Sequence, residues 1–292
     1  MISININIEE GLGMSYKVVV DSCGELTEEM KQSGKVESVP LSIQIENENI
    51  IDDDTFNQKE FLCKVAESPE CPKSSCPSPE RYMESYKCHA DRIYVVTLSA
   101  ELSGSYNSAV LGKNIYEEEY GEKKIHIFNS RSASVGETLI AQKIIECEEK
   151  GLDFEKVIET VDSYIREQNT YFVLETLETL KKNGRLTGVK ALVASALNIK
   201  PVMAATPQGT ICQLGKSRGV NKALDKMIDH VMKDVLHAEE KVLAIAHCNC
   251  YERALSVKKT LEERGKFKEI IILDTRGIST MYANDGGIIV VV

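Results

Sequence analysis

Short apolar runs alternate with longer amphipathic stretches through the first half of the chain. The runs are rich in valine and isoleucine, which is typical of buried strands. We expect strands at 16–20, around 39–45, at 92–98 and at 124–129. We expect helices from 27, at 58–66, at 79–88, at 104–118 and at 136–150. Single helices between strands predict a parallel sheet covered on both faces, with its binding site at the carboxyl ends of the strands.

The second half has a different pattern. We expect strands at 171–173, 199–203, 209–213, 241–247, 268–273 and 286–292, and helices at 177–184, 188–197, 217–235 and 251–264. The strands at 199–203 and 209–213 resemble a pair, so this half predicts a smaller α+β domain. We place the boundary near Arg166, which divides the chain into an N-terminal extension at 1–15, a parallel three-layer α/β/α domain at 16–166 and an α+β domain at 167–292.

Charge and composition narrow the class of protein. The chain has 292 residues and 42% hydrophobic residues, enough for two cores, and 45 acidic against 35 basic residues give a net charge of -10. Such a surface disfavours nucleic acid and anionic membranes as partners. The apolar stretch at 287–292 is far shorter than the roughly 20 residues that span a bilayer, so we expect no stable membrane insertion. Nine cysteines and no secretory signal indicate a reducing cytoplasm.

Three hydroxyl-bearing loops follow predicted strands or precede predicted helices. Residues 99–106 hold Ser99, Ser103 and Gly104 at the start of a helix, where hydroxyls and backbone N–H groups suit a carboxylate or phosphate. The same turn is also ordinary helix capping. The loop at 74–79, with Ser74 and Ser75, is either a rigid support for the polar groups that hold a ligand head or another helix cap. The loop at 129–134 also follows a strand and precedes a helix, so all three loops could meet at one edge of the sheet.

One predicted helix is largely apolar, and common catalytic motifs are absent from the sequence. Residues 191–197 are apolar around most of the helix and form either core or the wall of a greasy pocket. No nucleophile elbow, phosphate-binding loop or zinc-protease helix is present. The cysteines and histidines at 247–250 and at 71–89 lack the paired spacing of a structural zinc site, so we expect no metal. His247 is either a ligand contact or a satisfied histidine at a strand end.

Several stretches, in this order, resemble the DegV family from about Tyr16 to the C-terminus. They are Asp21-Ser22, Val39-Pro40-Leu41, Ser78-Pro79, Leu102-Ser103-Gly104-Ser105-Tyr106-Asn107-Ser108-Ala109, Ser130-Arg131-Ser132-Ala133-Ser134-Val135-Gly136, Leu174-Glu175-Thr176-Leu177-Glu178, Gly184-Arg185-Leu186 and Asn198-Ile199-Lys200-Pro201. The resemblance implies a long-chain fatty acid in the cleft between two domains, its carboxylate held by hydroxyls, and no other cofactor.

The resemblance also implies particular site residues. The family's Thr-Ser-Gln-Pro-Ser-Pro loop corresponds to 74–79, with Cys76 in place of glutamine, and the serine of its Leu-Ser-Gly turn corresponds to Ser103. The family's Gly-Thr-His-Thr-Gly loop corresponds to 279–283, which contains Thr280 but no histidine. Family members that serve as carriers present the acid to a fatty acid kinase, and Arg218 matches an arginine implicated in docking.

Two other functions stay open. An acyl or phosphoryl transfer enzyme on the same scaffold would use Ser103 as nucleophile and His247 as base, which requires the two within hydrogen-bond reach. A lipid-sensing regulatory module would differ from a carrier only in its protein partner. For a carrier, an acyl chain of about sixteen carbons would gain on the order of ten kcal/mol from burial, before ordering costs.

Overall fold

The computed structural model describes residues 15–186 and 198–292. The expected extension at 1–15, except for Ser15, and the expected helix at 188–197 lie outside the described residues. The apolar segment at 191–197, interpreted above as core or pocket wall, therefore has no structural account.

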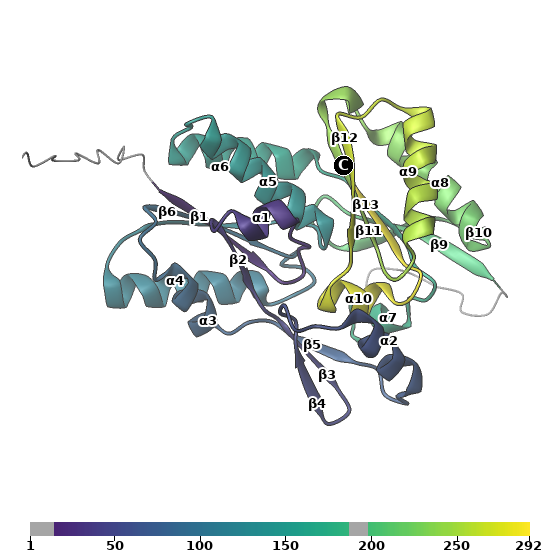
Figure 1. Ribbon diagram of the computed structural model, residues 1–292, viewed down its shortest axis with the longest axis horizontal. Coiled ribbons are helices and arrows are strands. Elements are labelled where there is room, and N and C mark those ends of the chain that lie inside the picture. The colour runs from purple at the N-terminus through teal and green to yellow at the C-terminus, as the bar shows by residue number, and fades with distance from the viewer. Residues whose placement is uncertain (1–14, 187–197) are drawn as a thin grey trace, which may run out of the picture.

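Four parallel strands form the first sheet, in the order β2-β1-β6-β7. They are β1 (Tyr16–Asp21), β2 (Val36–Val39), β6 (Arg92–Thr97) and β7 (Lys124–Asn129). The flanking helices are α1 (Glu28–Gln32), α3 (Pro79–Tyr86), α4 (Ser105–Tyr120), α5 (Val135–Glu149) and α6 (Phe154–Glu167). Val18 and Val20 pack towards α5 and α6, whereas Val19 packs towards α3 and α4. The predicted three-layer arrangement is confirmed (Figure 1).

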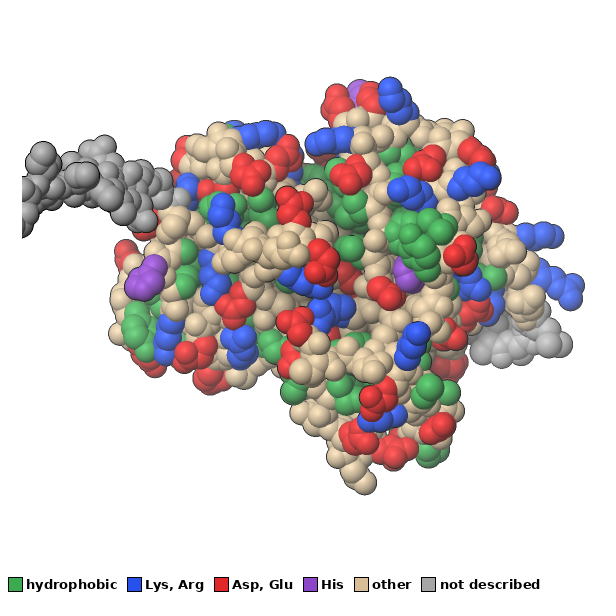
Figure 2. Space-filling view, viewed as in Figure 1, with side chains coloured by type: hydrophobic (Ala, Val, Ile, Leu, Met, Phe, Trp, Pro, Cys, Tyr) green, Lys and Arg blue, Asp and Glu red, His purple; other side chains and the backbone are tan. Residues whose placement is uncertain are grey.

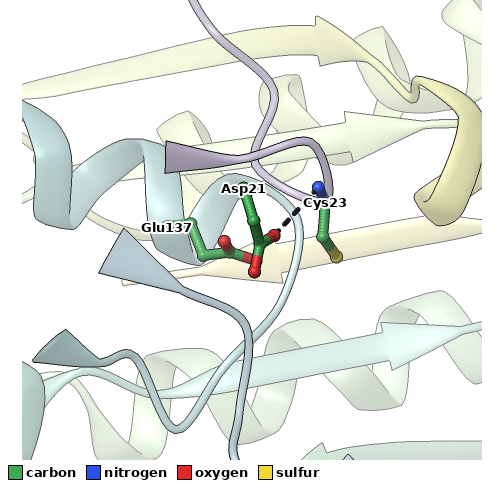
Figure 3. Close-up of side chains that lie close together, drawn as sticks. All are labelled: Asp21, Cys23 and Glu137. Atoms are coloured by element: carbon green, nitrogen blue, oxygen red, sulfur yellow. Dashed lines mark hydrogen bonds between the residues drawn. The ribbon is translucent and has the colours of Figure 1, made fainter. Parts of the chain in front are cut away.

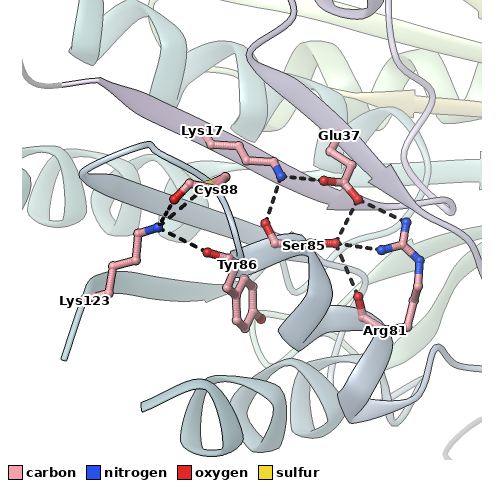
Figure 4. A network of polar contacts seen from close by, with 7 residues as sticks. All are labelled: Lys17, Glu37, Arg81, Ser85, Tyr86, Cys88 and Lys123. Atoms are coloured by element: carbon pink, nitrogen blue, oxygen red, sulfur yellow. Dashed lines mark hydrogen bonds and ion pairs between the residues drawn. The ribbon is translucent and has the colours of Figure 1, made fainter. Parts of the chain in front are cut away.

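A polar network fastens α3 to this sheet (Figure 4). Lys17 of β1 lies 2.5 Å from the carboxylate of Glu37 in β2 and donates to the carbonyl of Ser85 at 2.8 Å. Arg81 donates to the same carboxylate at 3.0 Å. Burial raises the pKa of Glu37, but the bonds from Lys17, Ser85 and Arg81 outweigh it and hold the pKa below its ordinary value. The network ties Arg81 and Ser85 of α3 to β1 and β2.

The second large sheet has six strands in the order β10-β9-β8-β13-β11-β12, and only β11 and β12 are parallel neighbours. The strands are β8 (Thr170–Val173), β9 (Ile199–Ala205), β10 (Ile211–Arg218), β11 (Val242–His247), β12 (Glu269–Asp274) and β13 (Ile288–Val291). Helices α8 (Val220–Asp234) and α9 (Tyr251–Arg264) cover one face, and a short helix, η1 (Ala238–Glu240), precedes β11. This mixed sheet confirms the predicted α+β architecture.

The expected strand around 39–45 is two strands in two sheets. Pro40 cannot donate to a ladder, so β2 ends at Val39 and the chain leaves the parallel sheet there. It continues as β3 (Ser42–Ile45) in a small antiparallel sheet with β4 (Glu48–Ile51) and β5 (Lys73–Ser75). Sequence patterning missed β4, β5 and α6, and it placed the start of α8 inside β10.

The predicted loop at 279–283 is part of a helix, α10 (Gly277–Ala283). Its first N–H groups find an acceptor that is far away in sequence, because Asp52 accepts from Gly277 at 2.8 Å and from Ile278 at 2.9 Å. Asp52 also accepts from the hydroxyl of Ser22 at 2.9 Å, which ties α10 to the end of β1. Helices α2 (Gln58–Glu67) and α7 (Glu178–Lys182) lie beside α10, where the two large sheets and the small sheet meet (Figure 1).

Acidic and basic side chains are interspersed over the visible surface (Figure 2). Among the described residues, no helix has the length and apolar character needed to cross a membrane.

Candidate functional site

A cavity lies between the carboxyl edge of the parallel sheet and the face of the six-stranded sheet that is opposite α8 and α9. It encloses about 850 Å³, including the part that is open to solvent. The parallel sheet contributes the residues that follow its strands, namely Cys23, Leu41, Leu98 and Ser132. The cavity is thus at the strand edge where the sequence placed a binding site.

The opposite wall is built from side chains that point alternately to the two faces of β8. Tyr171 and Val173 point into the core beneath α8 and α9, whereas Thr170, Phe172 and Leu174 line the cavity. The neighbouring strands continue this wall with Ala205, Ile211 and Ile289. A strand covered by helices on one face therefore presents an apolar face to the cavity on the other.

Several serines line the cavity with their hydroxyls already bonded to protein. Ser132 shares a hydrogen bond of 2.6 Å with Thr170, and Ser134 donates to the carboxylate of Glu25 at 2.7 Å. Ser279 donates to the carbonyl of Cys23 at 3.0 Å. An acyl chain packed against these walls leaves the hydroxyl bonds intact, so it incurs little of the cost of burying unpaired polar groups.

One part of the cavity gathers polar groups from four segments. Ser74 of β5 and Tyr282 of α10 share a hydrogen bond of 2.9 Å between their hydroxyls. The guanidinium of Arg185 lies 5.9 Å from the Tyr282 ring and donates to the carbonyl of Leu102 at 3.1 Å. Ser103 completes the group, and all four side chains line the cavity. Burial raises the pKa of Tyr282, so its phenol stays protonated and can donate to an anion.

Comparison with known proteins shows to which family this chain belongs. A protein-family model described as "Uncharacterised protein, DegV family" matches residues 15–292. The chain belongs to the DegV family. A DegV domain-containing protein of Streptococcus gordonii is 32% identical over 94% of this chain and 98% of its own length.

Two solved DegV-type structures are similar over nearly the whole chain. A DegV family protein from Ruminococcus gnavus, refined with vaccenic acid, is 68% identical, with a TM-score of 0.94 and coverage of 96% of this chain and 100% of that one. The fatty acid kinase B3 protein of Streptococcus pneumoniae, loaded with linoleic acid, is 32% identical, with a TM-score of 0.86 and coverage of 95% and 99%. The two-domain fold expected from the DegV resemblance is therefore confirmed.

The structure brings some of the predicted site residues of this DegV protein together and leaves others apart. Ser74 and Ser103 line the cavity. The hydroxyl of Ser99 donates to the carbonyl of Gly209 at 2.8 Å, and that of Thr280 bonds to Thr275 at 2.8 Å. Three further predicted residues are not among those that line the cavity. Ser75 is exposed on β5, Gly104 precedes α4, and Arg218 is exposed at the end of β10.

Sequence reasoning did not select Arg185 or Tyr282 as site residues. Both lie in stretches singled out for the DegV resemblance, Gly184-Arg185-Leu186 and 279–283. The histidine that is missing from the second stretch was the available signal. Without it, a neighbouring residue must donate the hydrogen bond to the head group.

His247 and Ser103 do not form a nucleophile and base pair. The His247 Nδ1 atom accepts from the N–H of Cys250 at 3.4 Å and lies 3.4 Å from the carboxylate of Asp274. Burial lowers the pKa of His247, although Asp274 opposes that shift. Within the described ranges, no hydrogen bond joins His247 to Ser103, whose hydroxyl accepts from the N–H of Ser105 at 3.2 Å.

Asp21, Cys23 and Glu137 form a buried cluster (Figure 3), and Cys23 also lines the cavity. Ligand atoms of Asp21, Cys23 and Glu137 lie within 4.8 Å of one another, a spacing that a metal ion could use. The two carboxylate oxygens of Asp21 accept from the N–H groups of Cys23 and Leu98, at 3.1 and 2.9 Å, and from the hydroxyl of Ser105, at 2.7 Å. Burial raises the pKa of Asp21, and these donors oppose that shift by stabilising the ionised form.

Glu137 has the opposite environment. Neither of its carboxylate oxygens has a hydrogen-bond donor among the described residues, and it is fully buried. Burial and the neighbouring charge of Asp21 raise its pKa well above the ordinary range. The arrangement favours a protonated Glu137 beside an ionised Asp21, with one proton shared between them.

Proposed function

We propose that this protein binds one long-chain fatty acid, with the acyl chain in the apolar cavity and the carboxylate at Ser74, Ser103, Tyr282 and Arg185. The cavity carries this proposal, because it combines apolar walls with one group of convergent hydroxyls and a cation. Burying a palmitate-length chain at ~0.8 kcal/mol per CH₂ supplies most of the affinity, and the polar groups orient the head. The acids bound by the Ruminococcus and Streptococcus relatives support the same ligand class.

The head-group residues give a direct prediction. Tyr282→Phe and Ser74→Ala each remove one hydroxyl from the pair that faces the carboxylate. A hydrogen bond to a charged group contributes about 1.5–3 kcal/mol, so we expect each variant to bind palmitate about tenfold or more weakly in a displacement titration. Tyr251→Phe, on the exposed start of α9, is the matched control and should bind as the unaltered protein does. Equal binding by all three variants would exclude this head-group site.

We further propose that the protein acts as a non-catalytic carrier in the cytoplasm and presents its fatty acid to a fatty acid kinase. The similarity to the fatty acid kinase B3 protein of S. pneumoniae supports such a partner. All nine cysteines are free, which suits a reducing compartment. A transfer enzyme using Ser103 and His247 lacks support, since the two side chains are held by other partners. A sensing role would use the same cavity and would differ in its protein partner.

Arg218 is the proposed docking residue. It is exposed at the end of β10 and is not among the residues that line the cavity. We expect Arg218→Ala to bind fatty acid with unchanged affinity and to lower the rate of acyl phosphate formation by a fatty acid kinase with ATP about tenfold. Lys259→Ala, an exposed cation on α9, serves as control. Unchanged turnover with Arg218→Ala would remove Arg218 from the docking surface and leave the binding proposal intact.

A further inference from the structure

The turn between β9 and β10 reaches from the six-stranded sheet to the parallel sheet. Thr206 and Thr210 close the turn through a backbone bond of 2.8 Å and a bond of 2.7 Å between their hydroxyls. Ala205, Gly209 and Ile211 line the cavity. The turn is therefore a closed, compact loop that forms part of the cavity wall, and we call residues 205–211 the strap.

Two side chains of the parallel-sheet unit hold the strap. Ser99 is fully buried and donates its hydroxyl to the carbonyl of Gly209 at 2.8 Å. Arg131 donates to the carbonyl of Pro207 at 3.3 Å from the exposed side. The fit is tight, because a Cβ added to Gly209 would overlap the Ser99 hydroxyl and lie 2.9 Å from the Arg131 Cα.

The backbone of Ser99 fixes the turn that carries Ser103. The carbonyl of Ser99 accepts from the N–H groups of Leu102 at 2.9 Å and Ser103 at 3.1 Å, and its own N–H donates to Ser132 at 2.8 Å. The Ser99 hydroxyl also accepts from the N–H of Glu101 at 3.3 Å, so one buried residue contacts both the strap and the head-group turn. The hydrogen bond from the Ser99 hydroxyl to the Gly209 carbonyl joins the parallel-sheet unit to the six-stranded-sheet unit.

We infer that Ser99 is a positioning residue that couples closure of the strap over the acyl chain to the placement of Ser103, and that fatty acid enters and leaves when the strap opens. The inference rests on the proposed function. The strap is suited to opening because β10 is the edge strand of its sheet and pairs only with β9 in the described structure. Ser99→Ala removes the hydroxyl, and with it the bonds to Gly209 and to the N–H of Glu101, and it leaves the backbone-to-backbone bonds of the head-group turn in place.

Stopped-flow measurement with a fluorescent long-chain fatty acid tests the inference. Loss of the buried bond to Gly209 should raise both the release and the association rate constants of Ser99→Ala about tenfold, because opening the strap helps passage in both directions. Gly209→Ala should act in the same direction through overlap with Ser99. Arg131, which also lines the cavity, donates an exposed bond that Arg131→Ala removes. This variant should raise both rates about two- to threefold, which provides a test should the buried variants fold poorly.

Two matched controls distinguish the effect of opening the strap from that of a general loss of stability. Ser85→Ala removes another buried serine hydroxyl, in the network of Figure 4 remote from the strap. Gly121→Ala places a Cβ at a similar left-handed φ of 86°, compared with 92° at Gly209, but meets no atom within 4 Å. Both should keep the rates of the unaltered protein.

The possible results separate this inference from the proposed function. Unaltered rates in Ser99→Ala, Gly209→Ala and Arg131→Ala would overturn the strap. Faster release with unchanged association would also overturn it, since that result indicates a lost ligand contact. If the unaltered protein binds no fatty acid at all, the proposed function itself fails.

Discussion

Ala205→Trp is expected to lower fatty-acid affinity roughly a thousandfold or more while leaving the protein folded. Ala205 is half-buried at the end of β9 and lines the cavity, so a larger side chain there projects into space intended for the ligand. An indole occupies the room of about six methylenes, and excluding those from burial forfeits about 5 kcal/mol. Displacement titration with palmitate gives the affinity, and thermal melting reports the fold.

The control for this variant is Ala66→Trp, since Ala66 is exposed at the end of α2. It adds the same side chain without entering the cavity and should bind palmitate normally. Normal binding by a folded Ala205→Trp protein would mean that the acyl chain occupies another part of the molecule.

The free energy of unfolding is expected to decrease as the pH rises from 5 to 8. Burial raises the pKa of Glu25 to about 7 and that of Glu137 well above the ordinary range. In the unfolded chain both groups lose their protons near pH 4.3. The folded state therefore binds more protons between these values, and each such group lowers stability by about 1.4 kcal/mol per pH unit until its folded pKa is reached.

Glu137→Gln isolates the larger contribution. Glutamine is neutral at every pH and is close in size and shape to the protonated carboxyl. Chemical denaturation at several pH values should show a shallower slope for Glu137→Gln and, at pH 8, a stability about 1–3 kcal/mol higher. Glu118→Gln, exposed on α4, should keep the original slope. An identical slope in Glu137→Gln would show that Glu137 is ionised throughout this range.

Periodicity predicted the two large sheets because most of their strands are buried apolar runs, whereas β4 and β5 are mostly polar and exposed. Strand β1 reads as a continuous apolar run since both of its faces are covered by helices, and the capping pair Ser78-Pro79 marked the start of α3 correctly. The short strands β4 and β5 have no such pattern. Helix α10 starts where Asp52 supplies a cap from the small sheet, and no local sequence signal contains that contact.

The site was harder to predict for a related reason. Sequence shows that a hydroxyl is present but not the partner to which it donates. Ser99 and Ser103 are alike in their local pattern, yet Ser99 bonds to the strap and Ser103 lines the cavity. Tyr282 reaches Ser74 only because α10 packs beside the small sheet, which is a tertiary contact.

Native mass spectrometry of the purified protein, beside a denatured and solvent-extracted sample, tests the central claim most directly. We expect the native spectrum to show one bound ligand per chain as additional mass. Extraction should recover this ligand as a free fatty acid in stoichiometric amount. Ala205→Trp should lack this mass, and Ala66→Trp should retain it. A native spectrum with no bound acid, unchanged after incubation with C14 to C18 fatty acids, would contradict the proposal that this cavity holds a fatty acid.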